Sequence, residues 1–241
     1  MSQRLKVLRE WAILIALPFL VADAQAYEAR YIGPTAVDLV QFLGPPPAAG
    51  SAVAQQDLDA VIRAQDARTP DSVAASKADA VVSVFRFSDV LGPAFRGDRL
   101  PKTQALFKAV ALDASQIGLR AKEHWQRPRP YRVSERVQPI VGVSTDGSYP
   151  SGHSMYGCLA AVLLGVIVPE QRDALLKRGS EFGLHRIVGG VHYPTDVEAG
   201  CTAGKITAAV LLQTPGFQAD FAAARDETRQ GLGLAPAGGT R

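Results

Sequence analysis

The sequence lacks the features that mark several protein classes. Among its 241 residues it has two cysteines and four histidines, and its formal net charge is only +3. No dense block of lysine and arginine indicates a nucleic-acid or membrane-surface partner. It has neither an internal repeat nor the period-two alternation that predicts strands. What is present is typical of a folded globular protein, with 47% hydrophobic and 20% charged residues in a chain long enough for one core.

Long apolar runs are scarce too. After the N-terminus the longest covers residues 155–168, shorter than the ~20 residues that a membrane-spanning helix needs. The N-terminal run, 11–22, contains Pro18, follows a basic segment and precedes Ala-Gln-Ala at 24–26. These are the three parts of a secretory signal peptide, so we expect residues 1–26 to be removed near Ala26. The mature protein would then be periplasmic or secreted; a retained N-terminal anchor is the alternative.

Helical periodicity predicts most of the remaining chain. Over residues 102–127 apolar residues recur at spacings of three and four, and Pro128 and Pro130 end the pattern. The other expected helices are 53–67, 71–91, 154–168, 170–185 and 195–213. Thr195 would open the last of these in a Thr-Asp-Val-Glu capping box. We predict an all-α, single-domain helical bundle over residues 27–230, followed by a disordered tail at 231–241.

The two cysteines leave two possibilities open. In an exported protein an even number permits a disulfide, whereas unpaired cysteines are commonly small buried residues. Cys158 lies five residues after His153, and Cys201 lies five residues after Asp196. Each therefore sits at a similar depth in a predicted helix. The sulfurs would meet if these helices packed side by side and parallel.

All four histidines lie within 69 residues, close to several cations. The residues concerned are His124, His153, His185 and His192, with Lys122, Arg127, Arg129 and Arg186. A metal site is not favoured, because no histidine pair has His-x-x-x-His spacing, no Cys-x-x-Cys exists, and arginines repel a cation. Guanidinium and ammonium groups suit an anion instead, phosphate above all.

The segment Ser151-Gly152-His153 opens the longest apolar run. The first N–H groups of a helix have no internal partner and bind anions, and glycine permits close approach to them. A histidine in the same turn can pass a proton to a departing atom. The segment therefore predicts a phosphate cradle with an acid beside it.

A second pair, His192 and Asp196, predicts a nucleophile. A carboxylate that accepts the Nδ1–H of an imidazole fixes its tautomer and leaves Nε2 free to attack. Because Pro194 lies between them, we expect His192 to precede a helix whose first turn carries Asp196. Lys122 and Arg129, at the end of an earlier helix, would contribute two cations.

Three segments together resemble a known family. KEHWQRPRP (122–130), YPSGH (149–153) and HRIVGGVHYPTD (185–196) are similar to the three-part motif of the type 2 phosphatidic acid phosphatase superfamily. The export signal and the helical body resemble the bacterial class A nonspecific acid phosphatases within it. The resemblance implies the helical bundle of the phosphatase and haloperoxidase kind and the hydrolysis of small phosphate monoesters. One position departs, because His185 stands where the family usually has serine.

The resemblance also implies a role for each motif residue. His192 would become phosphohistidine, Asp196 would orient it, and His153 would act as general acid and later as base. The implied phosphate ligands are Lys122, Arg129, Ser151, Gly152 and Arg186. No metal, other cofactor or nucleic-acid partner is implied, and a homo-oligomer is suggested. His192 must be neutral to attack while His153 must be protonated to donate, so we expect their pKa values to be pushed apart.

Two alternative functions use the same residues. In vanadate-dependent haloperoxidases, which share this architecture, His192 would bind vanadate. A non-catalytic anion-binding module would need neither the His192–Asp196 pair nor a second histidine. His124, between motif positions, is expected at the surface or behind the site.

Overall fold

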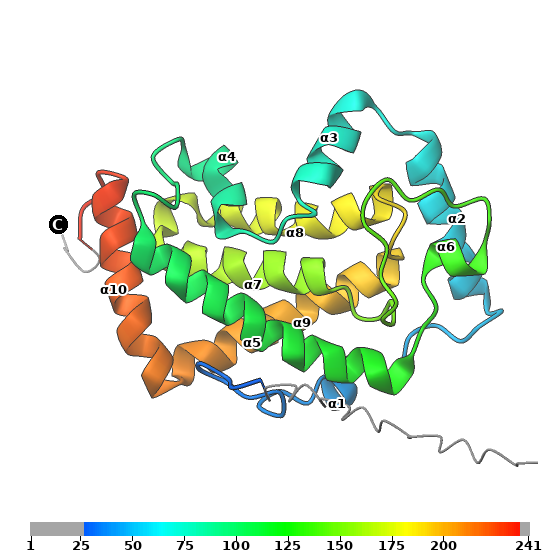
Figure 1. Cartoon of the computed structure of the whole chain (residues 1–241), viewed down its shortest axis with the longest axis horizontal. Helices are drawn as coiled ribbons and strands as arrows, with labels where there is room; N and C mark the ends of the chain where they lie inside the picture. The colour runs from blue at the N-terminus through cyan, green and yellow to red at the C-terminus, as the bar shows by residue number, and fades with distance from the viewer. Residues whose placement is uncertain (1–26, 237–241) are drawn as a thin grey trace, which may run out of the picture.

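Helix α7 (Gly152–Ile167) lies at the centre of the fold because it is apolar on all sides. It packs against α8 (Arg172–Val188) and α9 (Pro194–Gln213), with α5 (Pro101–Trp125) alongside (Figure 1). This computed structural model describes residues 27–236. In that range the regular structure is entirely helical, which confirms the predicted fold class. The predicted signal peptide lies outside the described residues.

The remaining elements cover this central group. They are α1 (Leu39–Leu43), α2 (Ala52–Asp66), α3 (Pro70–Ala78), η1 (Val84–Phe87), α4 (Ser88–Leu91), α6 (Pro130–Val133), η2 (Pro169–Gln171) and α10 (Pro215–Gly231). Within residues 27–236, no helix combines the length and apolar character that crossing a bilayer requires.

Glycines allow α7 to approach its neighbours closely. A Cβ added to Gly157 would lie 2.4 Å from the carbonyl oxygen of Gly179 in α8. One added to Gly204 in α9 would lie 2.2 Å from the carbonyl oxygen of Met155. Only glycine fits at such contacts. They bring the first turns of α7 and α9 next to the last turns of α8, where the second and third sequence motifs lie.

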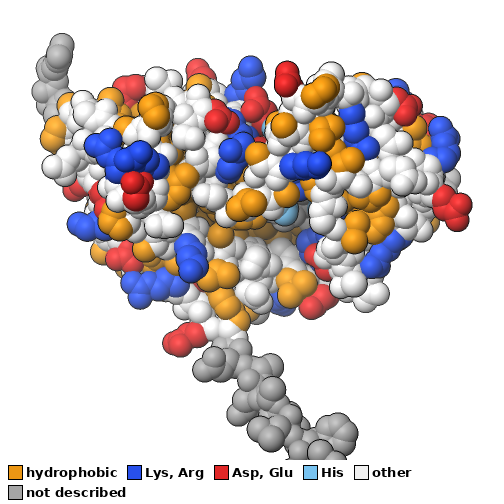
Figure 2. All heavy atoms as spheres, turned by 45° about the horizontal axis from the view of Figure 1, so that its top comes forward, with side chains coloured by type: hydrophobic (Ala, Val, Ile, Leu, Met, Phe, Trp, Pro, Cys, Tyr) orange, Lys and Arg blue, Asp and Glu red, His pale blue; other side chains and the backbone are white. Residues whose placement is uncertain are grey.

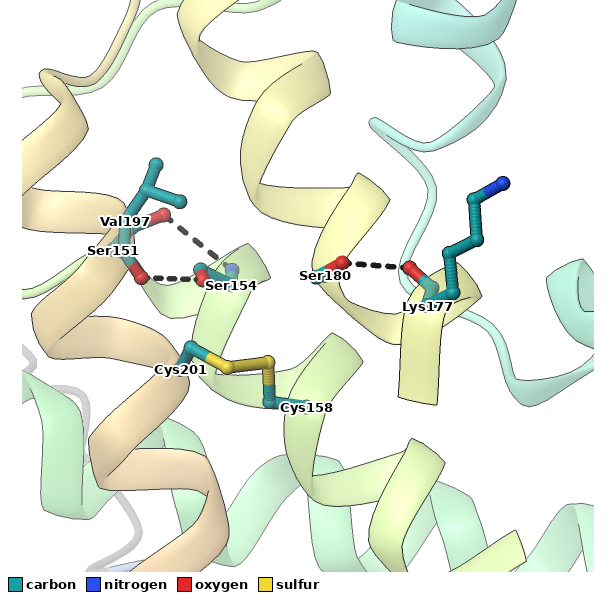
Figure 3. The surroundings of a disulfide bond; sticks show 7 residues. All are labelled: Ser151, Ser154, Cys158, Lys177, Ser180, Val197 and Cys201. Atoms are coloured by element: carbon teal, nitrogen blue, oxygen red, sulfur yellow. Dashed lines mark hydrogen bonds between the residues drawn. A yellow bond between two sulfur atoms is a disulfide. The ribbon is translucent and has the colours of Figure 1, made fainter. Parts of the chain in front are cut away.

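A disulfide between Cys158 and Cys201 joins α7 to α9 (Figure 3). One turn earlier, the Ser154 hydroxyl donates to the carbonyl of Val197 at 2.7 Å. The two helices therefore run side by side from the same end of the bundle. Of the two possibilities for the cysteines, the structure contains the disulfide.

Three helix predictions need correction. The helix expected over 71–91 is interrupted after α3, where the buried carboxylate of Asp79 accepts bonds from Arg178 of α8. Helix α9 begins at Pro194 rather than being capped by Thr195, and Asp196 accepts the N–H of Tyr193 at 2.9 Å. Helix α10 was not predicted, since Pro215 and Gly216 are common chain breakers but here form its first turn.

Residues 232–236 do not form the expected loose tail. Leu232 and Leu234 pack against the main core, and the Arg229 side chain donates to the carbonyl of Ala235. The prediction of disorder from residue 231 is therefore wrong up to residue 236. The final residues, 237–241, lie outside the described part of the chain.

We expect loss of the disulfide to destabilise the fold. The two cysteines are 43 residues apart, and in the chain-entropy model such a cross-link contributes ~4 kcal/mol. The double variant Cys158→Ala/Cys201→Ala should lower the free energy of unfolding in urea by about that amount. Thiol titration of denatured, unreduced protein should find no free thiol; two would contradict the structure.

Candidate active site

The sequence-predicted residues come from five elements that meet at one end of the bundle. Lys122 lies in the last turn of α5 and Arg129 directly before α6. Ser151 caps α7, whose first turn carries Gly152 and His153. Arg186 lies in the last turn of α8, while His192 precedes α9 and Asp196 lies in its first turn.

Ser151 holds the first turn of α7 in place. Its hydroxyl accepts the N–H of Ser154, the cap that the sequence predicted, and its own N–H donates to the carbonyl of Asp196 at 2.9 Å. Gly152 is exposed, and a Cβ added there would meet nothing within 4 Å. The start of α7 is thus fixed to α9 and still open on the side of Gly152.

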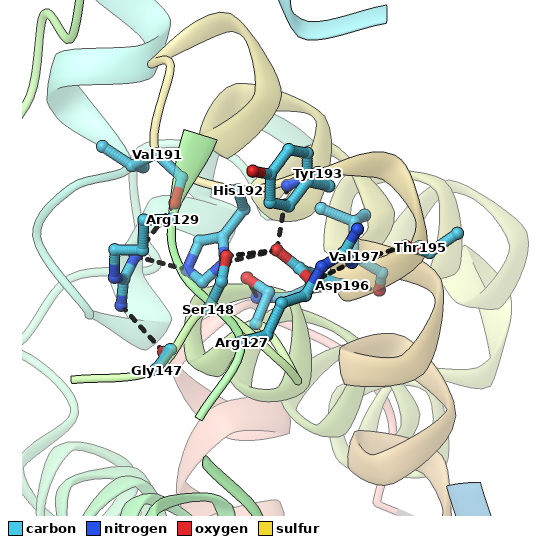
Figure 4. Close-up of polar contacts among 12 residues, drawn as sticks. Arg127, Arg129, Gly147, Ser148, Val191, His192, Tyr193, Thr195, Asp196 and Val197 are labelled. Atoms are coloured by element: carbon cyan, nitrogen blue, oxygen red, sulfur yellow. Dashed lines mark hydrogen bonds and ion pairs between the residues drawn. The ribbon is translucent and has the colours of Figure 1, made fainter. Parts of the chain in front are cut away.

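His192 and Asp196 form a buried pair (Figure 4). Nδ1 of His192 lies 3.3 Å from Oδ2 of Asp196, and Nη1 of Arg129 lies 3.1 Å from Nε2. Because a guanidinium only donates, Nε2 accepts this bond and the ring proton is on Nδ1. The geometry therefore gives the tautomer whose Nε2 lone pair faces the cations.

The carboxylate of Asp196 has further partners. Oδ2 accepts from the Ser148 hydroxyl at 2.5 Å, and Oδ1 from Nη1 of Arg127 at 2.6 Å (Figure 4). Burial acts to raise the pKa of Asp196, but His192 and Arg127 together hold it below its usual value. Asp196 is therefore ionised, and its negative charge stabilises the Nδ1–H tautomer.

Arg127 in turn connects the site to α2. Its Nη2 donates to Oδ2 of Asp57 at 2.7 Å, and its guanidinium lies 4.1 Å from the ring centre of Tyr193. Sequence reasoning noted Arg127 only as one of several cations and missed Asp57 and Ser148. Ser148 is adjacent to the YPSGH segment, but nothing in the sequence marks Asp57, which lies 139 residues before Asp196.

The carboxylate of Asp146, which was not predicted as a site residue, forms ion pairs with the two cations of the first motif. Oδ2 of Asp146 lies 3.1 Å from Nζ of Lys122, and Oδ1 lies 2.7 Å from Nη2 of Arg129. Burial would raise the pKa of Asp146, but Ser144, Lys122 and Arg129 hold it well below the usual range. The two oxygens of this carboxylate engage the donors that the sequence assigned to an anion.

The two site histidines are not separated in pKa as expected. Burial lowers the pKa of His192 to about 3, outweighing the opposing hydrogen bond to Asp196. Burial and then the charge of Arg186 lower that of His153 to about 4, although Nε2 lies 3.1 Å from the carbonyl of Ala80. Both His192 and His153 are therefore neutral near pH 7, contrary to the expected separation of their pKa values.

Arg186 is buried between α3 and His153. Its Nη2 donates to the carbonyl of Ser76, while among residues 27–236 its buried Nε has no hydrogen-bond partner. A buried guanidinium N–H without a partner is costly, so it favours a nearby anion.

The other two histidines lie away from His192. The Nδ1 of His185 is 2.7 Å from Oδ2 of Asp79, a carboxylate also bound by Arg178. The residue that departs from the family motif is thus part of an ion cluster between α3 and α8. His124 is exposed and packs edge-on against Trp125, so it lies at the surface.

A cavity of about 320 Å³ opens beside the site and is lined by Lys122, Asp146, Gly152 and His153, among others. Figure 2 shows one face of the molecule, on which a histidine side chain is visible in a hollow near hydrophobic side chains. Larger cavities of about 630 and 560 Å³ lie against the loop at 45–50 and contain none of the sequence-predicted site residues.

Comparison with known proteins identifies the family of this chain and proteins that share its fold. Residues 104–219 match the PAP2 superfamily model. A non-specific acid phosphatase of Providencia stuartii is 31% identical over 80% of this chain and 81% of its own, and one of Salmonella typhimurium is 29% identical over 89% and 91%. A bacterial vanadium-dependent iodoperoxidase shares the fold, with a TM-score of 0.53 and 18% identity over 73% of this chain and 53% of that one.

The lowered pKa of His192 predicts a loss of stability in acid. An unfolded histidine takes up a proton near pH 6.5, but folded His192 does so only near pH 3, so the unfolded state binds more protons between these values. The free energy of unfolding must therefore fall as pH falls through this window, by about 2 kcal/mol from pH 7 to pH 5 for this one group.

Urea unfolding at pH 7 and pH 5 tests this prediction. His192→Gln should lose about 2 kcal/mol less stability between the two pH values than the unsubstituted protein. The matched control is His124→Gln, which removes an exposed histidine. An identical loss in the His192→Gln variant and the unsubstituted protein would show that buried His192 does not resist protonation.

Proposed function

We propose that this chain, which belongs to the PAP2 superfamily and is an acid phosphatase, hydrolyses phosphate monoesters through a phosphohistidine on His192 and without a metal ion. One observation carries the proposal. The Nε2 of His192 accepts from Arg129 while Asp196 holds the opposite ring nitrogen. A neutral imidazole in this tautomer has its nucleophilic lone pair directed at the proposed phosphate site.

The phosphate would bind at the mouth of α7. Lys122, Arg129 and Arg186 would surround its oxygens with positive charge, the largest contribution expected for phosphoryl transfer. The Ser151 hydroxyl accepts from Ser154 and keeps its hydrogen to donate, and the amide N–H of Gly152 points out of the helix. These cations and donors supply the electrostatic stabilisation without a metal.

His153 would protonate the leaving oxygen and later take a proton from water. It lines the same cavity as Lys122 and Gly152, and Arg186 lies close enough to lower its pKa. A phosphate dianion would offset that positive charge and raise the pKa of His153 toward the protonated, donating form. Acidic conditions would then favour the productive complex.

Export is the second part of the proposal. Residues 1–26 would direct secretion, with cleavage near Ala26, and residues 27–230 would form the catalytic domain. The Cys158–Cys201 disulfide supports this location, because disulfides persist in oxidising compartments. Mass spectrometry of the mature protein would test cleavage, and light scattering would test the homo-oligomer.

Chelation should leave activity intact. Because the proposed site is built from Lys122, Arg129 and Arg186, hydrolysis of p-nitrophenyl phosphate should persist in EDTA. Vanadate should inhibit by occupying the same donors in a trigonal-bipyramidal form. Activity that is lost in EDTA and restored by a divalent ion would reject the metal-free mechanism. Oxidation of bromide in the presence of peroxide and vanadate would instead favour the haloperoxidase alternative.

Substitution of the two histidines should have different consequences. His192→Ala removes the nucleophile and should lower kcat by at least ~10³ on aryl and alkyl phosphates alike. His153→Ala should lose ~10² or more on glucose 6-phosphate, whose alkoxide needs a proton, but less on p-nitrophenyl phosphate. Rates under conditions where phosphoryl transfer is limiting check this. Equal losses on both substrates in His153→Ala would contradict its role as acid.

Asp146 should compete with phosphate for its cations. Asp146→Asn removes the negative charge from Lys122 and Arg129, so inorganic phosphate should inhibit at a concentration at least about fivefold lower. The control is Asp89→Asn, which removes a carboxylate paired with Arg178 instead. Weaker phosphate inhibition in Asp146→Asn would show that this carboxylate organises the site rather than competing within it.

A further inference from the structure

One face of α5 lines two adjoining cavities. The inner cavity, of about 320 Å³, contains Lys122, Leu119 and Ala111; the outer one, of about 450 Å³, continues past Ala111 to Gln104. Lining residues along α5 recur at spacings of three and four and therefore share one side of the helix. Lys122 lies 18 positions after Gln104, which corresponds to ~27 Å of helix.

The opposite wall makes the two cavities continuous. Val82 and Tyr156 line both, as do Ala111 and Ser115 of α5. We call the combined space the α5 groove. Its inner end holds His153 and two groups of the proposed phosphate site, Lys122 and Gly152.

The lining of the groove is mostly apolar. Along α5 none of the lining residues between Lys108 and Lys122 is charged, and the carboxylate of Asp146 lies at the Lys122 end. Two large aliphatic side chains face solvent at its rim, Val82 with 44% and Leu112 with 50% of their surface exposed. Covering such surface with an apolar group is favourable, whereas a sugar would require several placed hydrogen-bonding groups.

We infer that the α5 groove binds the leaving group and that the enzyme favours phosphate monoesters of elongated apolar alcohols. This inference rests on the proposed phosphate site, since the phosphate at Lys122 determines which end of the groove the alcohol enters. A bond forms between phosphorus and Nε2 of His192 as the P–O ester bond breaks, and the alkoxide takes the proton of His153. Water then cleaves the P–N bond, which releases inorganic phosphate.

A series of n-alkyl phosphates tests the groove directly. Ethyl, butyl and octyl phosphate have nearly the same leaving-group chemistry, so only contact with the groove differs among them. Because a groove open to solvent covers each methylene in part, kcat/KM should rise about twofold per methylene, below the roughly fourfold expected for full burial. The substrates are used below the concentrations at which octyl phosphate forms micelles.

Variants at the rim identify the surface responsible. In Val82→Asn/Leu112→Gln the octyl-to-ethyl ratio of kcat/KM should fall at least tenfold. The matched control is Leu184→Gln, because Leu184 is 52% exposed but lines neither cavity, and it should keep the wild-type ratio.

The outcomes separate this inference from the proposed function. If ethyl phosphate is hydrolysed but octyl phosphate is no better, the groove does not bind the leaving group and the phosphatase mechanism is untouched. A chain-length dependence that survives the double variant would also overturn the inference. Failure to hydrolyse any alkyl or aryl monoester would reject the proposed function itself. A flat chain-length series together with a change of oligomeric state in the double variant would assign the groove to a subunit interface.

Discussion

The positions of the site residues depend on one buried carboxylate, that of Asp196. Its side chain binds Arg127 from the first sequence motif and holds His192 from the third, and it also accepts from Ser148. Its backbone carbonyl accepts the N–H of Ser151 at the start of α7. A carboxylate buried with this many donors stays ionised, so one residue fixes both the tautomer of the imidazole and the position of the first turn of α7.

Helix packing keeps those contacts in register. Glycines let α7 lie against α8 and α9 at distances that a Cβ would not permit, and a Cβ on Gly183 would lie 2.4 Å from a methyl of Val197, one residue after Asp196. The disulfide joins α7 and α9 one turn farther along. Because the scaffold is closely packed around the site, the groups at its mouth have little freedom to rearrange, which favours preorganised electrostatic stabilisation.

Features that depend on neighbouring residues in the sequence were predictable. Periodicity identified the long helices except α10, the serine before the apolar run identified the cap of α7, and Pro194 placed His192 outside the helix that carries Asp196. The partners of these residues were not predictable, because Asp57 and Asp146 reach the site through tertiary folding. The pKa of His153 was misjudged for the same reason: burial and the charge of Arg186 are properties of the folded chain.

The central claim is that phosphorus becomes bonded to Nε2 of His192 during turnover, and rapid quenching tests it most directly. Enzyme that is turning over a ³²P-labelled aryl phosphate would be denatured in alkali within milliseconds. It would then be digested at alkaline pH, and the labelled peptide would be identified by mass spectrometry. The account predicts an acid-labile, alkali-stable label on the peptide that contains His192, at a level reduced in Asp196→Asn. Label on a different residue would contradict it. Steady-state turnover during which no labelled protein can be trapped would also contradict it.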